Sequence, residues 1–107
     1  MISISLCMIV KDEEGVLGQC LDSAKELVDE IIIVDTGSKD KTKEIAYRYT
    51  DMVYDFQWTD DFSAARNYSF SKATKDYIMW LDADDIILKK DLDQLKLLKK
   101  QLNLEYD

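Results

Sequence analysis

The sequence contains no histidine and no proline, and among its 107 residues only three are glycine and two are cysteine. Without histidine, every mechanism that needs an imidazole base or an imidazole metal ligand is excluded. Cys7 lies in an apolar strand-like run and Cys20 on an apolar helix face, and neither belongs to a zinc-binding pattern. We therefore expect two buried free thiols. Without proline, the helix ends depend on Gly, Asp and Ser signals.

Long apolar runs and an excess of basic residues are also missing. No apolar run approaches ~20 residues, so we expect neither a signal peptide nor a transmembrane segment here, and the cytoplasm is the expected compartment. Lys and Arg number 14 against 22 Asp and Glu, a formal net charge of -8, which argues against a nucleic-acid partner. That balance fits a protein that meets anionic ligands through a metal. The hydrophobic fraction of 47% is enough for one domain with one buried core.

Strand-like and helix-like apolar patterns alternate along the chain. Residues 3–10 and 30–35 are continuous apolar runs, as in strands covered on both faces, and residues 52–56 and 77–82 are the other expected strands. The expected helices are residues 14–28, a segment with Ile45, Ala46 and Tyr49 after an Asp40 N-cap, residues 62–73, and residues 90–102 with Leu92, Leu95, Leu98 and Leu102 on one side. This alternation predicts an α/β fold with a Rossmann-like parallel sheet of about four strands flanked by helices.

Three of the four expected strands are followed by carboxylates. Ligands of parallel α/β sheets bind beyond the carboxyl ends of the strands, where the strand order reverses. The segments at these ends are Lys11-Asp12-Glu13-Glu14, Asp35-Thr36-Gly37-Ser38 and Asp82-Ala83-Asp84-Asp85. Their convergence predicts a ligand site at this edge of the sheet.

The Asp82-Ala83-Asp84 segment directly follows an apolar strand. Two carboxylates spaced i and i+2 can turn toward one point, and Mg²⁺ sites typically combine one or two carboxylates with substrate phosphates. The alternative is a solvated acidic turn before the last helix, with Asp85 or Asp91 favouring its N-terminus. Carboxylates gathered at the end of a buried strand repel one another without a counterion, so we favour a divalent metal, Mn²⁺ or Mg²⁺.

Other polar and aromatic side chains have open roles. Asp35 can accept hydrogen bonds from a nucleobase or ribose, or it can stabilise the following turn, where Gly37 allows a positive φ. Arg66 suits phosphates and planar bases, and the alternative is a surface salt bridge to Asp60 or Asp61. Trp58 and Trp80 are both expected in the core, and the alternative for each is an aromatic platform for a ligand.

Four segments keep one order and spacing across nearly the whole chain. They read Ser5-Leu6-Cys7-Met8-Ile9-Val10-Lys11-Asp12-Glu13-Glu14, Ile33-Val34-Asp35-Thr36-Gly37-Ser38-Lys39-Asp40-Lys41-Thr42, Phe62-Ser63-Ala64-Ala65-Arg66-Asn67 and Trp80-Leu81-Asp82-Ala83-Asp84-Asp85. Together they resemble the motifs of family 2 glycosyltransferases with the GT-A fold. Their residues are most similar to the motifs of the bacterial subgroup that includes peptide and cell-envelope glycosyltransferases.

The resemblance implies a site for a nucleoside diphosphate sugar, usually a UDP-sugar. Asp35 would meet the base, with Gly37 beside it, and Arg66 would lie near the base or diphosphate. Asp84 would ligate Mn²⁺ or Mg²⁺. The remaining residues implied in nucleotide binding are Val10, Lys11, Asp12, Asp82, which would contact the ribose or a metal-bound water, and Ala83.

The resemblance also implies a longer domain, because the family continues well beyond the Asp-x-Asp strand with the acceptor site and an acidic catalytic base. We expect residues 1–107 to form a single donor-binding domain, truncated before the acceptor half, with weak or no transfer activity alone. Glu105 and Asp107 lie too near the end to serve as that base, so the catalytic residue is unknown. An exposed sheet edge predicts self-association.

Two other classes of function stay open at this point. One is a non-catalytic nucleotide-binding or assembly module derived from this fold. The other is a different α/β phosphotransfer enzyme, which would need an aspartyl nucleophile and a Lys or Ser/Thr partner farther along the chain. For a glycosyltransferase, the expected location is the cytoplasm, including the cytoplasmic face of the membrane.

Overall fold

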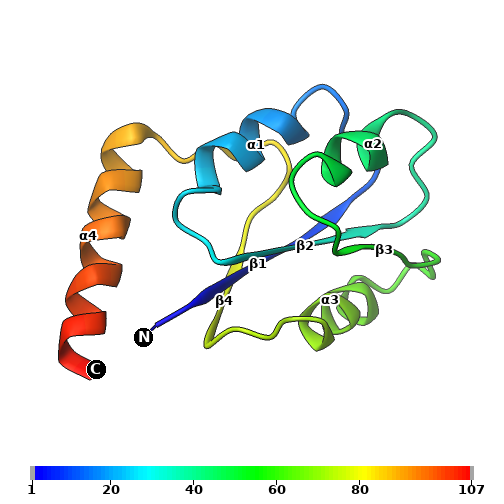
Figure 1. The fold of residues 1–107 in the computed structure, drawn as a ribbon. Helices are drawn as coiled ribbons and strands as arrows, with labels where there is room; N and C mark the ends of the chain where they lie inside the picture. Colours follow the sequence, from blue (N-terminus) through cyan, green and yellow to red (C-terminus); the bar gives the residue numbers. More distant parts are fainter. Residues whose placement is uncertain (1, 107) are drawn as a thin grey trace.

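A computed structural model describes the backbone of residues 2–106 and the side chains of residues 2–101. Strands and helices alternate throughout this part of the chain (Figure 1). In order they are β1 (Ile4–Val10), α1 (Leu17–Ala24), β2 (Glu30–Asp35), α2 (Thr42–Tyr47), β3 (Val53–Asp55), α3 (Phe62–Ser71), β4 (Tyr77–Trp80) and α4 (Lys89–Tyr106). The strands form a four-stranded parallel sheet in the order β3-β2-β1-β4. The predicted α/β fold is confirmed.

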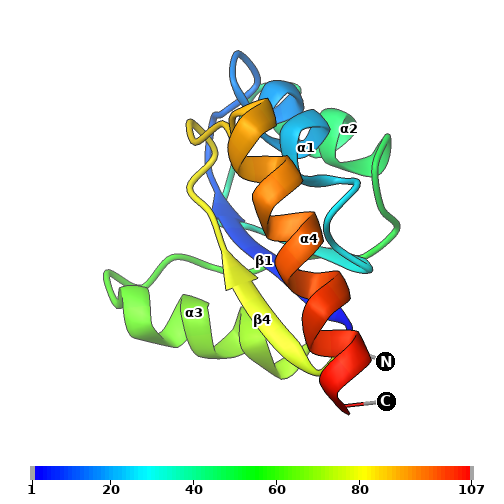
Figure 2. The same cartoon turned by 90° about the vertical axis from the view of Figure 1, so that its left-hand side faces the viewer.

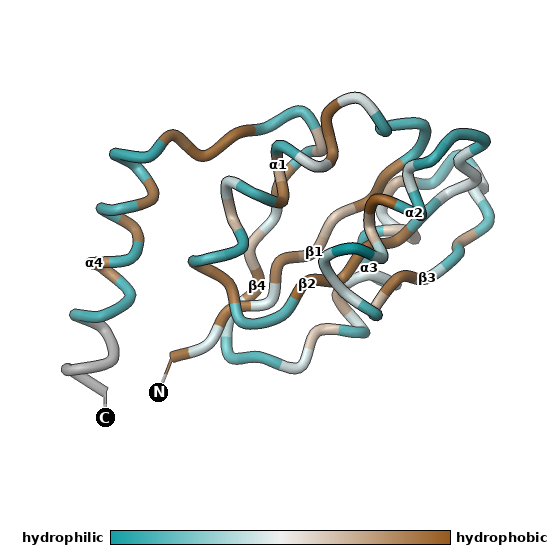
Figure 3. The backbone as a smooth tube through the Cα atoms, turned by 45° about the horizontal axis from the view of Figure 1, so that its top comes forward, coloured by the Kyte–Doolittle hydropathy of each residue, from teal (hydrophilic) through white to brown (hydrophobic). Residues whose placement is uncertain are grey.

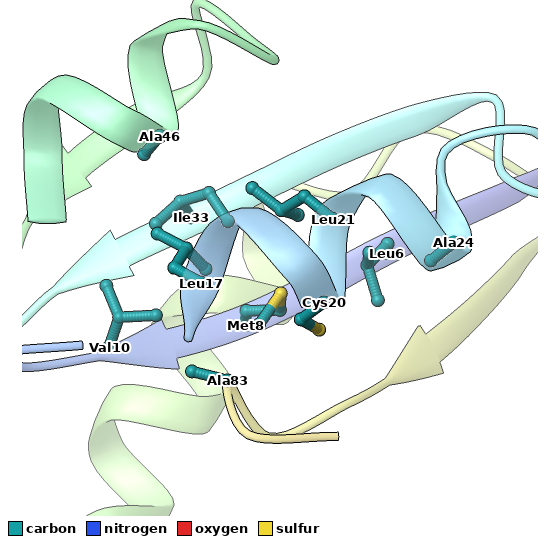
Figure 4. Close-up of a cluster of buried hydrophobic side chains, with 10 residues drawn as sticks. All are labelled: Leu6, Met8, Val10, Leu17, Cys20, Leu21, Ala24, Ile33, Ala46 and Ala83. Carbon is teal, nitrogen blue, oxygen red and sulfur yellow. The ribbon is translucent and has the colours of Figure 1, made fainter. Parts of the chain in front are cut away.

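Helices cover both faces of this sheet, with α1, α2 and α4 on one face and α3 on the other (Figure 2). The main core lies between β1 and α1, because alternate strand residues and one helical stripe meet there (Figure 4). Its buried members are Leu6, Met8, Val10, Leu17, Cys20, Leu21, Ala24, Ile33, Ala46 and Ala83. Cys7 points the other way, with its Sγ 3.8 Å from the carbonyl of Ser69 on α3. Both cysteines are buried and free, as expected.

Hydrophobic residues concentrate in the central strands, and hydrophilic residues fill the loops near α2 (Figure 3). The edge strand β4 differs, because Tyr77 and Ile78 are 55% and 44% exposed. The leucine stripe of α4 is also poorly covered: Leu92 is half-buried, whereas Leu95 and Leu98 are exposed. The side chain of Leu102 lies outside the described residues. None of the helices in residues 2–106 has the length and apolar character needed to cross a membrane.

Helix α1 is shorter than the predicted segment 14–28. At its start, the amides of Val16 and Leu17 both donate to the carbonyl of Glu13 in a turn, and at its end Leu27 donates to Ala24. Helix α2 begins at Thr42 with Lys41 at the cap position, so the predicted Asp40 N-cap is wrong by one residue. Asp40 still accepts the Thr42 amide at 2.9 Å.

Candidate nucleotide site

The carboxyl ends of the parallel strands meet at one edge of the sheet. Val10 on β1 is level with Asp35 on β2, and Asp35 is level with Asp55 on β3. The chain runs from β1 to β2 and β3 on one side, and β4 then returns to the other side of β1. The order therefore reverses next to β1, which is where ligands of such sheets bind. The segments that follow β1, β2 and β4 all leave the sheet at this edge.

Asp35 is the most enclosed of the predicted site residues, at 2% exposure. Its Oδ1 accepts hydrogen bonds from the amides of Gly37 at 2.9 Å and Ser38 at 2.8 Å. Gly37 adopts a φ of 116°, which favours glycine. The turn-stabilising role anticipated for Asp35 is thus present, but it uses only one oxygen. Its Oδ2 is buried with no hydrogen-bond partner in the structure.

The Asp82-Ala83-Asp84 segment alternates between outward and inward side chains. Ala83 is 5% exposed and belongs to the core (Figure 4), which leaves its backbone as the part available to a ligand. Asp82 and Asp84 are exposed. The turn closes through the Asp85 amide, 3.0 Å from the Asp82 carbonyl, and through the Asp82 amide, 2.9 Å from Asp85 Oδ2. Asp85 therefore stabilises the turn, and Asp82 and Asp84 face outward from it.

Cys20 on α1 packs against the backbone of this turn. Its Sγ lies 3.6 Å from the carbonyl oxygen of Asp82. Burial, and then the negative charges of Asp85, Asp84 and Asp82, raise the pKa of the Cys20 thiol to about 11. Cys20 is buried with its thiol against the backbone of Asp82, so it packs against the turn that carries Asp82 and Asp84.

The donor set suits a metal that is shared with a ligand. Within residues 2–101, no three Asp, Glu or Cys side chains converge as a group able to hold a metal ion. After β4, the edge presents the two exposed carboxylates of Asp82 and Asp84, which face outward from the turn. Since Mg²⁺ commonly takes one or two carboxylates and completes its shell with substrate phosphates and water, this pair fits a divalent ion bound together with a diphosphate.

Arg66 stacks on aromatic rings instead of pairing with Asp60 or Asp61. Its guanidinium carbon lies 5.0 Å from the centre of the Phe62 ring and 5.9 Å from that of Trp80. The two acids have other partners: Asp61 accepts the Ala64 amide and caps α3, and Asp60 accepts Trp58 Nε1 at 3.0 Å. Arg66 thus projects from the start of α3 with its guanidinium on an aromatic platform.

A shallow pocket of about 250 Å³ opens at Thr36, the residue that follows Asp35. It is lined by Ile9, Val10, Lys11, Glu13, Thr36, Trp58 and Phe62. Trp58 is 39% exposed, so its predicted core position is wrong, whereas half-buried Trp80 packs edge-to-face against Phe62 and Phe70. Phe62 was not predicted as a lining residue, whereas a lining role for Trp58 was considered only as the alternative to a core position. The signal that was available is their position in and after the polar loop that follows β3.

These features describe an α/β protein with carboxylates gathered at the carboxyl edge of its parallel sheet. The sequence matches the model of the family described as "Glycosyl transferase family 2" over residues 5–104. The chain therefore belongs to glycosyltransferase family 2.

Two curated relatives illustrate the extent of the similarity. A TPR repeat-containing protein of Synechococcus elongatus is 49% identical over 88 residues, which are 82% of this chain and 22% of that protein. The SPbeta prophage-derived glycosyltransferase SunS of Bacillus subtilis is 34% identical over 91 residues, 82% of this chain and 21% of its own length. The chain thus spans about a fifth of the length of these relatives.

Solved structures agree with the fold. Glucosyl-3-phosphoglycerate synthase of Mycobacterium tuberculosis in complex with UDP superposes with a TM-score of 0.68 and 25% identity, covering 79% of this chain and 35% of that one. The first 349 residues of TarS from S. aureus give a TM-score of 0.70 at 21% identity, covering 94% of this chain and 33% of that one. The α/β fold of this chain matches that of GT-A glycosyltransferase structures.

Proposed function

We propose that this chain binds a nucleoside diphosphate sugar, most favourably a UDP-sugar, together with Mn²⁺ or Mg²⁺, as the donor-binding part of a glycosyltransferase. The observation that carries the proposal is the unpartnered, buried Oδ2 of Asp35 at the same edge as the exposed carboxylates of Asp82 and Asp84. Structures of the mycobacterial synthase contain UDP with Mg²⁺, and UDP-glucose with Mn²⁺. These complexes support the same ligands for this chain.

We assign the contact with the nucleobase to Asp35. A buried polar atom without a partner is unfavourable, and a ligand N–H that reaches it regains the lost hydrogen bond. Uracil offers an imide N–H of this kind. Because Asp35 is 2% exposed, the base must displace the side chains that cover it. Val10, Lys11 and the aromatic ring of Trp58 line the pocket at the neighbouring Thr36, and rings of this kind stack on planar bases.

The diphosphate and metal are assigned to the opposite side of β1. Asp84 is the proposed metal ligand, and Asp82 the proposed contact to the ribose or to a metal-bound water. A bound divalent ion supplies Lewis-acid stabilisation of the charge that develops on the leaving diphosphate. Lys11, Asp12 and Gly37 complete the nucleoside side. Arg66, held on the rings of Phe62 and Trp80, supplies a fixed positive charge for the base or diphosphate.

Calorimetric titration with UDP, CDP, GDP and ADP, each with and without Mn²⁺, tests this proposal. UDP with Mn²⁺ is expected to bind most tightly. Because two carboxylates provide only part of a coordination shell, Mn²⁺ alone is expected to bind at least about tenfold more weakly than in the presence of UDP. If UDP with Mn²⁺ does not bind, or if Asp84→Ala binds it as well as the unchanged chain, the proposal is wrong.

A non-catalytic nucleotide-binding module is the second candidate. Apart from Asp82 and Asp84, which are assigned to the metal and the ribose, no described residue at the carboxyl edge of the sheet is identified as a catalytic base. The two candidates share the binding site and differ in turnover. Release of free sugar from UDP-sugar, or transfer to an added acceptor, by this chain with Mn²⁺ contradicts the non-catalytic module. Tight UDP binding with no turnover by the chain supports it.

A further inference from the structure

The loop after β1 (residues 11–16) and the loop after β2 (residues 36–41) exchange hydrogen bonds in both directions. Three consecutive amides of the first loop, those of residues 12–14, donate to side chains of the second loop and of the first residue of α2. The acceptors are Ser38 Oγ, 2.9 Å from the Asp12 amide, Thr42 Oγ1, 2.7 Å from the Glu13 amide, and Asp40 Oδ2, 3.3 Å from the Glu14 amide.

The return bonds run from the second loop to side chains of the first. The amide of Lys39 donates to Asp12 Oδ1 at 2.7 Å, and the amide of Lys41 donates to Glu14 Oε2 at 3.3 Å. We call this set of five cross-loop bonds the loop clasp. It uses the carboxylates of Asp12, Glu14 and Asp40 as acceptors for backbone amides, so these three acids serve to join the two loops.

Thr42 and Asp40 reinforce the clasp locally. The Thr42 hydroxyl and its amide both donate to Asp40 Oδ1. The hydrogen bond from the Thr42 hydroxyl, with those from the amides of Thr42 and Glu14, lowers the pKa of Asp40 below its ordinary value. Asp40 therefore stays a charged acceptor throughout the neutral range.

Ser38 connects the clasp to the proposed base-binding carboxylate. Its amide donates to Asp35 Oδ1 at 2.8 Å, while its Oγ accepts the Asp12 amide at 2.9 Å. Asp12 adopts a φ of 53°, a left-handed conformation that surrounding contacts must maintain in a residue other than glycine. With Oδ1 of Asp35 fixed by two amides, the Asp35 side chain cannot rotate freely, and its Oδ2 is the oxygen left unpartnered.

We propose that Ser38 is a positioning residue, which couples the two loops to Asp35 and holds the free Asp35 oxygen in the orientation that receives the base. This inference rests on the proposed nucleotide function. A site whose groups are already oriented before binding loses less conformational entropy when the ligand arrives. Loss of the Ser38 hydroxyl leaves the Asp12 amide without its acceptor and removes one of the five clasp bonds, the one next to Asp35.

The test measures affinities for UDP with Mn²⁺ and for pyrophosphate with Mn²⁺, which has no base. Ser38→Ala is expected to weaken UDP binding by roughly fivefold, the effect of losing about one hydrogen bond, and to leave pyrophosphate binding unchanged. Ser38→Thr keeps the hydroxyl and is expected to restore UDP binding. The matched control is Ser71→Ala, which removes a hydroxyl bonded to the Tyr68 carbonyl at the end of α3 and leaves both affinities unchanged.

A second variant tests the clasp from the other loop. Asp12→Gly accepts the left-handed backbone and removes the acceptor of the Lys39 amide, so UDP binding is expected to weaken. In the double variant with Ser38→Ala, the combined loss is expected to be smaller than the sum of the single losses, because both changes break one clasp.

The outcomes separate this inference from the proposed function. If the unchanged chain does not bind UDP with Mn²⁺, the proposed function fails, and the inference fails with it. If the unchanged chain binds UDP and Ser38→Ala binds it equally well, or loses UDP and pyrophosphate affinity in equal measure, the inference alone is overturned.

Discussion

Carboxylates lie at both ends of the parallel sheet, and Asp29 and Glu30 at the amino end differ from Asp35, Asp82 and Asp84 at the carboxyl end in where their hydrogen-bond partners come from. At the amino end, Glu30 accepts the amide and hydroxyl of Thr74 at 2.9 and 2.6 Å and the hydroxyl of Ser5 at 2.8 Å. Asp29 accepts a backbone amide at 2.8 Å and pairs with Lys99 at 2.7 Å. For both groups burial opposes ionisation, but these partners outweigh it and lower each pKa.

At the carboxyl end, Asp35, Asp82 and Asp84 do not use all their carboxylate oxygens in bonds within the protein. Asp35 has one oxygen bonded and one buried without a partner. Asp82 and Asp84 are exposed beyond β4, held outward because Ala83 between them packs into the core. The amino-end carboxylates join β1, β2 and the segment before β4, and so stabilise the fold. The carboxyl-end group leaves polar atoms free for a ligand, at some cost in stability.

The largest expected effect is at Asp84. Asp84→Asn keeps the size of the side chain and removes its charge, so affinity for UDP in the presence of Mn²⁺ is expected to fall on the order of 100-fold, or about 2.7 kcal/mol. Calorimetry measures the affinity. Asp51→Asn, an exposed residue in the turn before β3, is the control. If both variants bind equally, the two ends of the sheet do not differ in metal binding.

Glu30→Ala is the corresponding change at the amino end. It removes the acceptor of three hydrogen bonds, and we expect the free energy of unfolding to fall by about 2 kcal/mol. Nucleotide affinity of the folded variant is expected to stay unchanged. Urea denaturation measures the first quantity and calorimetry the second. A loss of UDP affinity with no loss of stability would reverse the assignment of the two ends.

Asp35→Asn is expected to move stability and binding in opposite directions. The amide oxygen can still accept from Gly37 and Ser38, while an NH₂ group replaces the unpartnered oxygen and opposes the imide N–H of uracil. UDP affinity is expected to fall roughly tenfold, which is about 1.4 kcal/mol, and the free energy of unfolding is expected to stay the same or rise. A variant that binds UDP normally would refute the base contact.

The smallest expected effect is on the pH dependence of stability. Glu30 has a folded pKa below its unfolded value, so its contribution is fully present above its ordinary value of 4.5 and is lost as the pH falls through the folded pKa. Thermal melts of the unchanged chain and of Glu30→Gln at neutral pH and at about pH 3.5 measure this. Glu30→Gln is expected to show the smaller loss on acidification. Equal losses would mean that Glu30 does not contribute.

The sequence was sufficient to predict where the strands lie, because buried parallel strands need continuous apolar runs such as residues 30–35. It also located carboxylates at strand ends. It did not reveal where α1 begins, because the amides of Glu13 and Glu14 bond to Thr42 and Asp40 on another loop. Trp58 was misplaced in the core for a similar reason, since local hydrophobicity carries no information about which neighbours cover a loop residue.

The composition by itself determined that these 107 residues carry no imidazole, and their apolar periodicity determined a parallel α/β sheet with acidic strand ends. Only the tertiary structure decided what each acid does. Strand order brought the segment after β4 beside Val10, and the cross-loop bonds of Asp12 and Ser38, 26 residues apart, determined which carboxylates serve the backbone. The physical reason is that a carboxylate's role depends on its hydrogen-bond partners, and most of these partners come from distant parts of the chain.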